Sequence, residues 1–460
     1  MTASRLVVVG GDAAGMTAAA QARRRRSPDE LEIVCFERGE FTSYAACGIP
    51  YLVGDVVHDP DALIARTPED HRRNGLDMRI RHEVVAIDVA ARTVNVRSLD
   101  DGTETTEPFD QLVLATGATP IRPPLPGIDA DGVFGVQTLG EGIALRAAVD
   151  TSNVEHAVVV GGGYIGLELA EALVLRGIQV ALVEAGPQPM PTLDPDMGAL
   201  VADALHHVGI DLHLEEAVEG FEVDDGAVRG VRTDGSVLPA DLVVLGIGVR
   251  PASELAAAAG LAVGPTRGIV VDDHQRTSAD GVFAAGDCIE TFHRVSRRPV
   301  AIALGTHANK QGRVAGINAT GGDAAFPGVV GTAVSKICKY EVARTGLSER
   351  EASDAGFDAV AATIDAQTRA SYYPGTRPLR VKLVVERDGG RVLGAQIVGE
   401  EGAAKRIDVL ALATWTGMTA GELLNVDLGY APPFSPLWDP VLVAARRAVA
   451  LVGADGESSA

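Results

Sequence analysis

The chain has 460 residues, 46% hydrophobic and 22% charged, which is typical of a soluble globular protein with about three domains. Its 62 acidic and 40 basic side chains give a formal net charge of −22, which excludes general binding to nucleic acid or anionic membranes. Apolar runs are too short to span a bilayer, and an expected strand follows Met1 too closely for a signal peptide, so we expect a cytoplasmic protein. Four cysteines without a C-x-x-C pair do not form a disulfide scaffold.

The first organised segment, Arg5–Gly15, reads RLVVVGGDAAG. It predicts a buried strand, a glycine turn and an alanine-rich helix, which is how a βαβ nucleotide-binding unit opens. A second strand then ends at Glu37, an acid placed to accept hydrogen bonds from ribose hydroxyls. Asp12 stands where the middle glycine of such turns usually lies, between Gly10 and Gly15, which weakens this motif taken alone.

The same pattern recurs about one domain later. Ala157–Gly166 reads AVVVGGGYIG, with all three glycines of the motif at Gly161, Gly163 and Gly166, and the next strand ends at Glu184. One G-x-G-x-x-G is weak support, but strand, turn, helix and distal acid occur together twice. Two nucleotide-binding folds are therefore predicted.

Two further segments support the first fold. Gln111–Pro120 is a predicted strand that ends in a Thr-Gly turn, and Thr277–Asp287 is another that ends in Gly286-Asp287. An aspartate at that place is suited to hold a ribityl hydroxyl or, through water, a diphosphate.

The combination resembles the pyridine nucleotide-disulfide oxidoreductase superfamily over nearly the whole chain. The resemblance implies an α/β protein with two Rossmann-like dinucleotide-binding domains, for FAD and NAD, and an α+β C-terminal dimerisation domain. The implied boundaries are 1–118 with 250–325 for FAD, 119–249 for NAD(P)H and 326–450 for dimerisation, with 451–460 as a disordered tail.

The resemblance also implies a set of cofactor-binding residues at the four motifs. They are Gly10, Asp12, Ala13, Ala14, Gly15, Glu37, Arg38, Ala115, Thr116, Gly117, Gly161, Gly163, Tyr164, Ile165, Gly166, Glu184, Gly248, Gly286 and Asp287. The carboxylate of Glu184 suits free ribose hydroxyls and repels a 2′-phosphate, which favours NADH and leaves NADPH possible.

Cys47 is the candidate redox centre. An internal dithiol needs a second cysteine three or five residues on, where the chain has Pro50 and Leu52. A thiol at a helix N-terminus can fall in pKa from about 8.5 to about 6, so we expect Cys47 to be largely thiolate at pH 7. The remaining cysteines, Cys35, Cys288 and Cys338, are predicted to be small buried hydrophobes.

The segment S-x-x-x-C-G-I-P-Y, with YAPPFS at Tyr430–Ser435, resembles the single-cysteine branch of the superfamily. That branch contains coenzyme A-disulfide reductases, NADH oxidases, NADH peroxidases and persulfide reductases. The resemblance implies that Cys47 forms a mixed disulfide with CoA in a homodimer whose active site is shared between subunits. Tyr430 of the other subunit and one of Tyr372 or Tyr373 would stabilise the departing thiolate.

Two alternatives stay open. An NAD(P)H oxidase or peroxidase would use a Cys47 sulfenic acid, but its usual histidine is replaced by Ala13. A redox-responsive flavoprotein would turn over slowly. Mercuric reduction needs a cysteine pair and a C-terminal thiol relay, and a fused persulfide reductase needs a C-terminal sulfurtransferase domain, for which the chain leaves no room.

A substrate such as CoA is anionic and needs local basic or polar groups on this acidic protein. The resemblance points to Gln21, Arg24, Ser43, Asn309 and Lys310. The arginines Arg66, Arg72 and Arg73, and the histidines His71, His206 and His207, are predicted to be solvated, and no histidine spacing predicts a metal site.

Overall fold

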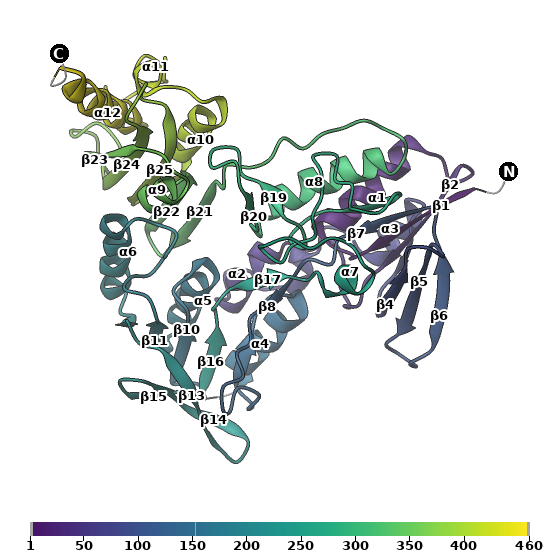
Figure 1. Ribbon diagram of the computed structural model, residues 1–460. Coiled ribbons are helices and arrows are strands. Elements are labelled where there is room, and N and C mark those ends of the chain that lie inside the picture. Colours follow the sequence, from purple (N-terminus) through teal and green to yellow (C-terminus); the bar gives the residue numbers. More distant parts are fainter. Residues whose placement is uncertain (1–2, 152, 458–460) are drawn as a thin grey trace.

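The computed structural model describes residues 3–151 and 153–457. Figure 1 shows two α/β folds and a third domain at the C-terminal end. The first fold holds a parallel sheet in the order β18-β7-β1-β2-β3. Strands that precede the second fold in the sequence therefore share one sheet with a strand that follows it. Its strands are β1 (Ser4–Val9), β2 (Leu31–Phe36), β3 (Asp77–Arg79), β7 (Gln111–Leu114) and β18 (Val282–Ala284).

The second fold repeats this plan with the parallel order β12-β11-β10-β16-β9. Its strands are β9 (Val133–Gly135), β10 (His156–Val160), β11 (Gln179–Glu184), β12 (Asp211–Leu214) and β16 (Leu242–Leu245). Each fold also carries a three-stranded antiparallel sheet, with strands β4 (His82–Asp88), β5 (Thr93–Ser98), β6 (Glu104–Pro108), β13 (Val218–Asp224), β14 (Ala227–Thr233) and β15 (Val237–Pro239). Two short antiparallel pairs are formed by β8 (Ala118–Pro120) with β17 (Val249–Pro251) and β19 (Thr291–Phe292) with β20 (Pro299–Val300).

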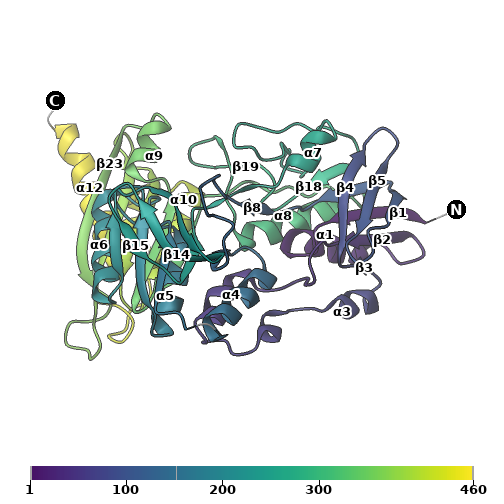
Figure 2. The ribbon, with the colours of Figure 1, turned by 90° about the horizontal axis from the view of Figure 1, so that it is seen from below.

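The third domain is built on an antiparallel sheet in the order β21-β22-β25-β24-β23. Its strands are β21 (Ala333–Ile337), β22 (Tyr340–Gly346), β23 (Ala359–Gln367), β24 (Pro378–Glu386) and β25 (Val392–Gly399), and its helices are α9 (Glu349–Asp354), α10 (Ile407–Thr416), α11 (Ala420–Leu424) and α12 (Pro440–Glu457). Figure 2 shows this domain beside the second fold, with the first fold at the other end. The predicted fold class is confirmed.

The remaining helices belong to the two nucleotide folds. They are α1 (Ala13–Arg25), α2 (Ile49–Val53), α3 (Pro68–Arg73), α4 (Leu139–Thr151), α5 (Tyr164–Leu175), α6 (Pro195–His207), α7 (Glu254–Ala258) and α8 (Gly305–Asn318). None of the helices in the described ranges is long and apolar enough to cross a membrane.

The closest helix packing joins α1 to α8. A Cβ at Gly312 would lie 2.2 Å from the carbonyl oxygen of Ala14, and one at Gly316 would lie 2.3 Å from that of Ala18. The two glycines are four residues apart and therefore share one face of α8, so the backbones touch along a full helical turn. This contact fixes α8 against the helix that follows the first glycine turn.

One prediction about the C-terminus is wrong. The segment 451–460 was expected to be a disordered tail, yet α12 continues through Glu457, and residues 458–460 lie outside the described residues. Earlier in the helix, Val441, Ala444, Ala445 and Ala448 are buried in the core that includes β24 and β25. The composition of the last residues suggested a tail. Those up to Glu457 instead extend a helix whose earlier part is anchored in the core of the third domain.

We predict that Gly312→Ala destabilises the first fold, because its methyl group overlaps the α1 backbone. Overpacking of this kind costs about 1–3 kcal/mol, so the thermal unfolding midpoint should fall. Gly140→Ala in α4, where nothing lies within 4 Å of the added Cβ, is the matched control and should be neutral or stabilising. Equal midpoints for the two variants would contradict the close packing.

Candidate active site

The two glycine turns are built alike. Gly10 has φ +112° and a Cβ there would lie 2.1 Å from the carbonyl oxygen of Ala115, while Gly161 has φ +102° and its Cβ would lie 2.6 Å from that of Gly246. At each turn the chain therefore touches the backbone at the end of a neighbouring strand, which only glycine allows.

The glycines that follow pack each helix on its strand. Cβ atoms at Gly15 and Gly166 would each lie 2.0 Å from the carbonyl oxygen of the first glycine of the turn. The two motifs differ at the middle glycine position. A Cβ at Gly163 would have nothing within 4 Å, whereas the first turn has Asp12 at the matching position. The open space at Gly163 is what close approach of a pyrophosphate requires.

The distal acids brace both turns in the same way. The carboxylate of Glu37 accepts hydrogen bonds from the amides of Gly11 and Gly39, both at 2.7 Å, and that of Glu184 from Gly162 and Gly186, both at 2.8 Å. Each carboxylate thus sits beside its turn, and its remaining lone pairs are available to a ribose. Sequence reasoning placed the acids correctly at the ends of β2 and β11 but missed these amide contacts.

Two carboxyl groups converge on the first turn. Burial raises the pKa of Asp12 to about 6, against donation from the amide of Tyr44 and with repulsion from Glu37 and Asp287 as further causes. Burial alone raises the pKa of Asp287 to about 6. Asp287 follows Gly286, whose φ of +86° turns the chain where its Cβ would meet Ala14.

The other predicted cofactor residues lie at the same strand ends. Thr116 donates from Oγ1 to the carbonyl oxygen of Ala252 at 2.6 Å, and Gly117 and Gly248 have φ of +71° and +97°. Ala13 and Ala14 open α1, Tyr164 and Ile165 open α5, and Arg38 follows β2. Glycine cradles, helix N-termini and distal acids fit one dinucleotide at each fold.

Cys47 lies between the two folds. It belongs to a short 3₁₀ turn, Ala46–Gly48, that leads into α2, and α2 packs on α4 and α5 of the second fold. The side chain is exposed in the isolated chain. A single thiol therefore stands where the segment leaving the first fold meets the motif helix of the second.

The expected low pKa of Cys47 is wrong for the chain itself. Although part of the Cys47 side chain is open to solvent, partial burial of the sulfur is the largest cause that raises its pKa, followed by repulsion from Glu168, with smaller contributions from Asp287 and Asp12. Its own backbone amide lowers the pKa without compensating. The favourable local turn is outweighed by burial of the sulfur together with acids that the fold brings in from three other segments.

Ser43 and His71 are joined in the structure. The Oγ of Ser43 lies 3.0 Å from Nε2 of His71, and only 1% of His71 is exposed. The prediction that His71 is solvated is wrong, whereas His206 and His207 are exposed as predicted.

Among the described residues Asp272, Asp273 and His274 cluster within 4.8 Å, but both His274 ring nitrogens already pair with carboxylates.

Apart from Ser43, the predicted substrate residues are divided between α1 and α8. Asn309 accepts from the hydroxyl of Thr17 at 2.7 Å and thus ties α8 to α1. Lys310 and Arg24 are exposed and Gln21 is half-buried. In the part of the chain that is described, Arg23, Arg25 and Arg26 bond to neighbouring loops while the guanidinium of Arg24 makes no such contact. The exposed side chains of Arg66, Arg72 and Arg73 agree with the prediction for these residues.

Sequence reasoning missed His307, at the start of α8 and one turn before Lys310. Burial and the charge of Lys310 lower its pKa to about 4, and its Nδ1 is buried without a hydrogen-bond partner. Because the ring is neutral at pH 7, it offers a polar atom and no charge. A histidine three residues before Lys310 was the only sequence signal.

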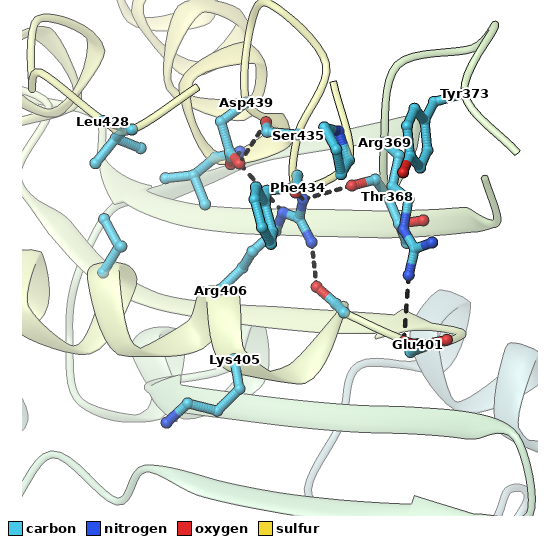
Figure 3. A pocket seen from close by; sticks show the side chains of 15 residues that line it. Thr368, Arg369, Tyr373, Glu401, Lys405, Arg406, Leu428, Phe434, Ser435 and Asp439 are labelled. Atoms are coloured by element: carbon cyan, nitrogen blue, oxygen red, sulfur yellow. Dashed lines mark hydrogen bonds and ion pairs between the residues drawn. The ribbon is translucent and has the colours of Figure 1, made fainter. Parts of the chain in front are cut away.

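The candidate tyrosines belong to the third domain. A hydrogen bond with Tyr372 is the main cause that raises the pKa of Tyr430, and both rings are exposed. Tyr373 instead lines a cavity of about 640 Å³ with Arg369 and Phe434, at its upper right in Figure 3. The structure therefore pairs Tyr430 with Tyr372.

The prediction for the other cysteines holds for two of the three. Cys35 and Cys288 are buried. Cys338 is half-buried in the turn between β21 and β22, with φ +54°, where burial and Glu171 raise the pKa of its thiol to about 11. It is therefore a turn residue beside α5 and not a core hydrophobe.

Family models match most of the chain. The pyridine nucleotide-disulphide oxidoreductase model matches residues 4–312, and the dimerisation domain of the same family matches residues 332–440. The chain belongs to the pyridine nucleotide-disulphide oxidoreductase family. Members of this family use FAD and a nicotinamide nucleotide in oxidation and reduction, so the chain is an FAD- and NAD(P)H-dependent oxidoreductase.

Relatives within the family carry different names. The chain is 38% identical to the NAD(P)H coenzyme A polysulfide/persulfide reductase of Pyrococcus horikoshii, over 96% of this chain and 98% of that protein. It is also 38% identical to an NADH oxidase of Methanocaldococcus jannaschii, over 97% and 98%. The structure of reduced CoADR-RHD from Bacillus anthracis superposes with a TM-score of 0.95 at 36% identity, covering 99% of this chain and 81% of that one.

We predict a pH-dependent effect of Asp12→Asn on the FAD-free protein. The folded-state pKa of about 6 lies above the ordinary 3.8, so the stability that the neutral carboxyl contributes is lost as the pH rises from about 4 to about 6. Asparagine should raise the unfolding midpoint at pH 7.5 and change it little at pH 4.5. Asp29→Asn, at an exposed carboxyl, is the control, and equal shifts at both pH values for Asp12→Asn would contradict the assignment.

Proposed function

We propose that the protein uses NAD(P)H to reduce the disulfide or persulfide of coenzyme A, or of a related small thiol, through Cys47. The observation that carries this proposal is the place of a lone thiol between the two dinucleotide folds, within electrostatic range of Asp12 and Asp287 on one side and Glu168 on the other. The name of the Pyrococcus relative supports coenzyme A as the thiol.

The residues present divide the binding work between the folds. In the first fold the turn at Gly10, Glu37 and Asp287 would hold FAD, and in the second the turn at Gly161 and Glu184 would hold the nicotinamide nucleotide. When bound, FAD accepts two electrons from NAD(P)H and makes them available for disulfide reduction.

Cys47 supplies the nucleophile. Its thiolate attacks one sulfur of the substrate RS–SR, which forms a Cys47–S–S–R bond and releases RS⁻. Two electrons then cleave that mixed disulfide, restore the Cys47 thiolate and release a second RS⁻. The balance is NAD(P)H + H⁺ + RSSR giving NAD(P)⁺ + 2 RSH. Because burial of the sulfur, and then the surrounding acids, raise the pKa of Cys47, the thiolate is a small minority of the isolated chain at pH 7.

A second subunit completes this site in our proposal. The third domain matches a dimerisation domain, and it exposes Tyr372, Phe434 and Leu437 to 74%, 76% and 72%. All three lie within residues 332–440, the part that matches the dimerisation domain, which supports an interface here. A homodimer would cover them and bring the Tyr372–Tyr430 pair to the partner's Cys47, where a phenol can protonate the departing thiolate.

Four free cysteines suit the reducing cytoplasm, where we place the enzyme.

The oxidase reading is the second candidate, because one relative of equal identity is named an NADH oxidase. In that case O₂ takes the electrons and Cys47 cycles through a sulfenic acid. The first turn has Ala13 where that branch has a histidine, which leaves this route without its usual acid-base partner.

We predict that Cys47→Ser abolishes NADH-dependent reduction of coenzyme A disulfide, because serine cannot form the mixed disulfide. The FAD spectrum and NADH–ferricyanide activity, which need no thiol, should persist. Cys338→Ser is the matched control and should retain disulfide turnover. Unchanged disulfide turnover in Cys47→Ser would refute the proposal, and NADH-driven O₂ consumption without disulfide would favour the oxidase.

We predict that Glu184→Gln relaxes nucleotide choice. Removing the charge beside the ribose removes repulsion of a 2′-phosphate, so the kcat/KM ratio of NADPH to NADH should rise about tenfold or more. Glu37→Gln makes the same change at the matching place of the first fold, and it should weaken FAD retention without altering the ratio. A ratio that moves equally in both variants would contradict the assignment of the second fold.

A further inference from the structure

We propose that His71 is a positioning residue, which fixes the hydroxyl of Ser43 for the substrate that reacts at Cys47. This inference rests on the proposed function, because the substrate it concerns is the small-thiol disulfide. It adds His71, a residue of α3 that was predicted from the sequence to be solvated, to the residues that act on the substrate. His71 would act through Ser43 and needs no contact with the substrate.

Ser43 has an uncommon backbone conformation. Its φ of +50° lies in the left-handed region, which a non-glycine residue adopts at a cost and keeps only where its surroundings enforce it. Three contacts enforce it here: its amide donates to Gly11 at 3.1 Å, its carbonyl accepts from Ala65 at 2.9 Å, and its hydroxyl meets His71 at 3.0 Å. Only the last of these determines where the hydroxyl points.

His71 is held firmly enough to direct that hydroxyl. It lies on α3, whose N-terminus is closed by a capping box between Thr67 and Asp70, and its side chain is buried. Burial, and then the charge of Arg66, lower the pKa of His71, so the ring is neutral at pH 7. A neutral ring offers one donor and one acceptor, and either one at Nε2 fixes the Ser43 hydroxyl and leaves its other hydrogen-bonding capacity free.

The same segment carries the reactive thiol. Ser43 precedes Cys47 by four residues, and between them Tyr44 pairs with Ile64 and the amide of Ala45 donates to Leu63 at 2.8 Å. The segment is therefore anchored at its start by the glycine turn and along its length by residues 63–65. A hydroxyl oriented at the start of this segment can hold a polar group of the substrate while the thiol attacks its sulfur.

The test is a double-mutant cycle in the FAD-loaded enzyme with coenzyme A disulfide as substrate. His71→Leu and Ser43→Ala should each lower kcat/KM about five- to tenfold, the effect of losing one hydrogen bond. The double variant should be no worse than Ser43→Ala, because His71 acts through Ser43. His71→Gln, which keeps a polar group near the position of Nε2, should recover most of the loss. His206→Leu, at an exposed histidine of α6, is the control.

Additive losses in the double variant would overturn the inference, as would an equal loss of NADH–ferricyanide activity in His71→Leu, since a structural histidine affects both reactions. If His71→Leu does not fold, the cycle uses two other variants, His71→Gln and His71→Asn. Each is then measured with and without Ser43→Ala. If the wild type reduces no disulfide, the proposed function fails by itself. Protection of Cys47 by coenzyme A against alkylation by iodoacetamide then replaces turnover: a non-additive loss of that protection in the same variants supports the inference, and an additive loss overturns it.

Discussion

The contact between each glycine turn and the end of a neighbouring strand is the constraint on which the rest of the structure depends. At Gly10 and Gly161 the chain runs so close to a carbonyl of that neighbour that no side chain fits. The turn that results leaves backbone amides free, and Glu37 and Glu184 each take one of them. In the first fold the carbonyl of Gly11 also accepts from Ser43, so the segment that carries the thiol is attached to the turn itself.

Much of this could be predicted because the steric demand of a glycine turn is local. Strand, turn, helix and distal acid are adjacent in the chain, and the two turns, their helices and both acids were found where the pattern placed them. The packing of Gly312 on Ala14 was not predicted, because its two halves are separated by almost the whole length of the two folds. The end of α12 was missed for a related reason: the earlier, buried part of the helix fixes the conformation, and the composition of the last residues does not show this.

Two properties of the candidate site, the pKa of Cys47 and the burial of His71, also depend on residues that are distant in the sequence. A helix start lowers the pKa of a thiol only when little else is near, and at Cys47 the fold buries part of the sulfur and adds Glu168 from α5 together with Asp12 and Asp287. His71 follows two acidic residues in a short polar helix and therefore looks solvated, yet its partner lies 28 residues earlier in the chain. Residue type and spacing identify which groups can react, but the fold determines which charges surround them.

Those charges constrain what binds. Burial is the main cause that raises the pKa of Asp12 and of Asp287, and the same two groups oppose a thiolate at Cys47. An anionic substrate that reached this thiol would meet a negative potential unless its charge were neutralised elsewhere. In the function proposed above, the exposed guanidinium of Arg24 near the C-terminal end of α1 would neutralise that charge, while the reacting sulfur carries no charge. An acidic centre and a basic helix end suit a ligand with a neutral reactive tip and a distant anionic group, and the coenzyme A disulfide proposed above has this charge pattern.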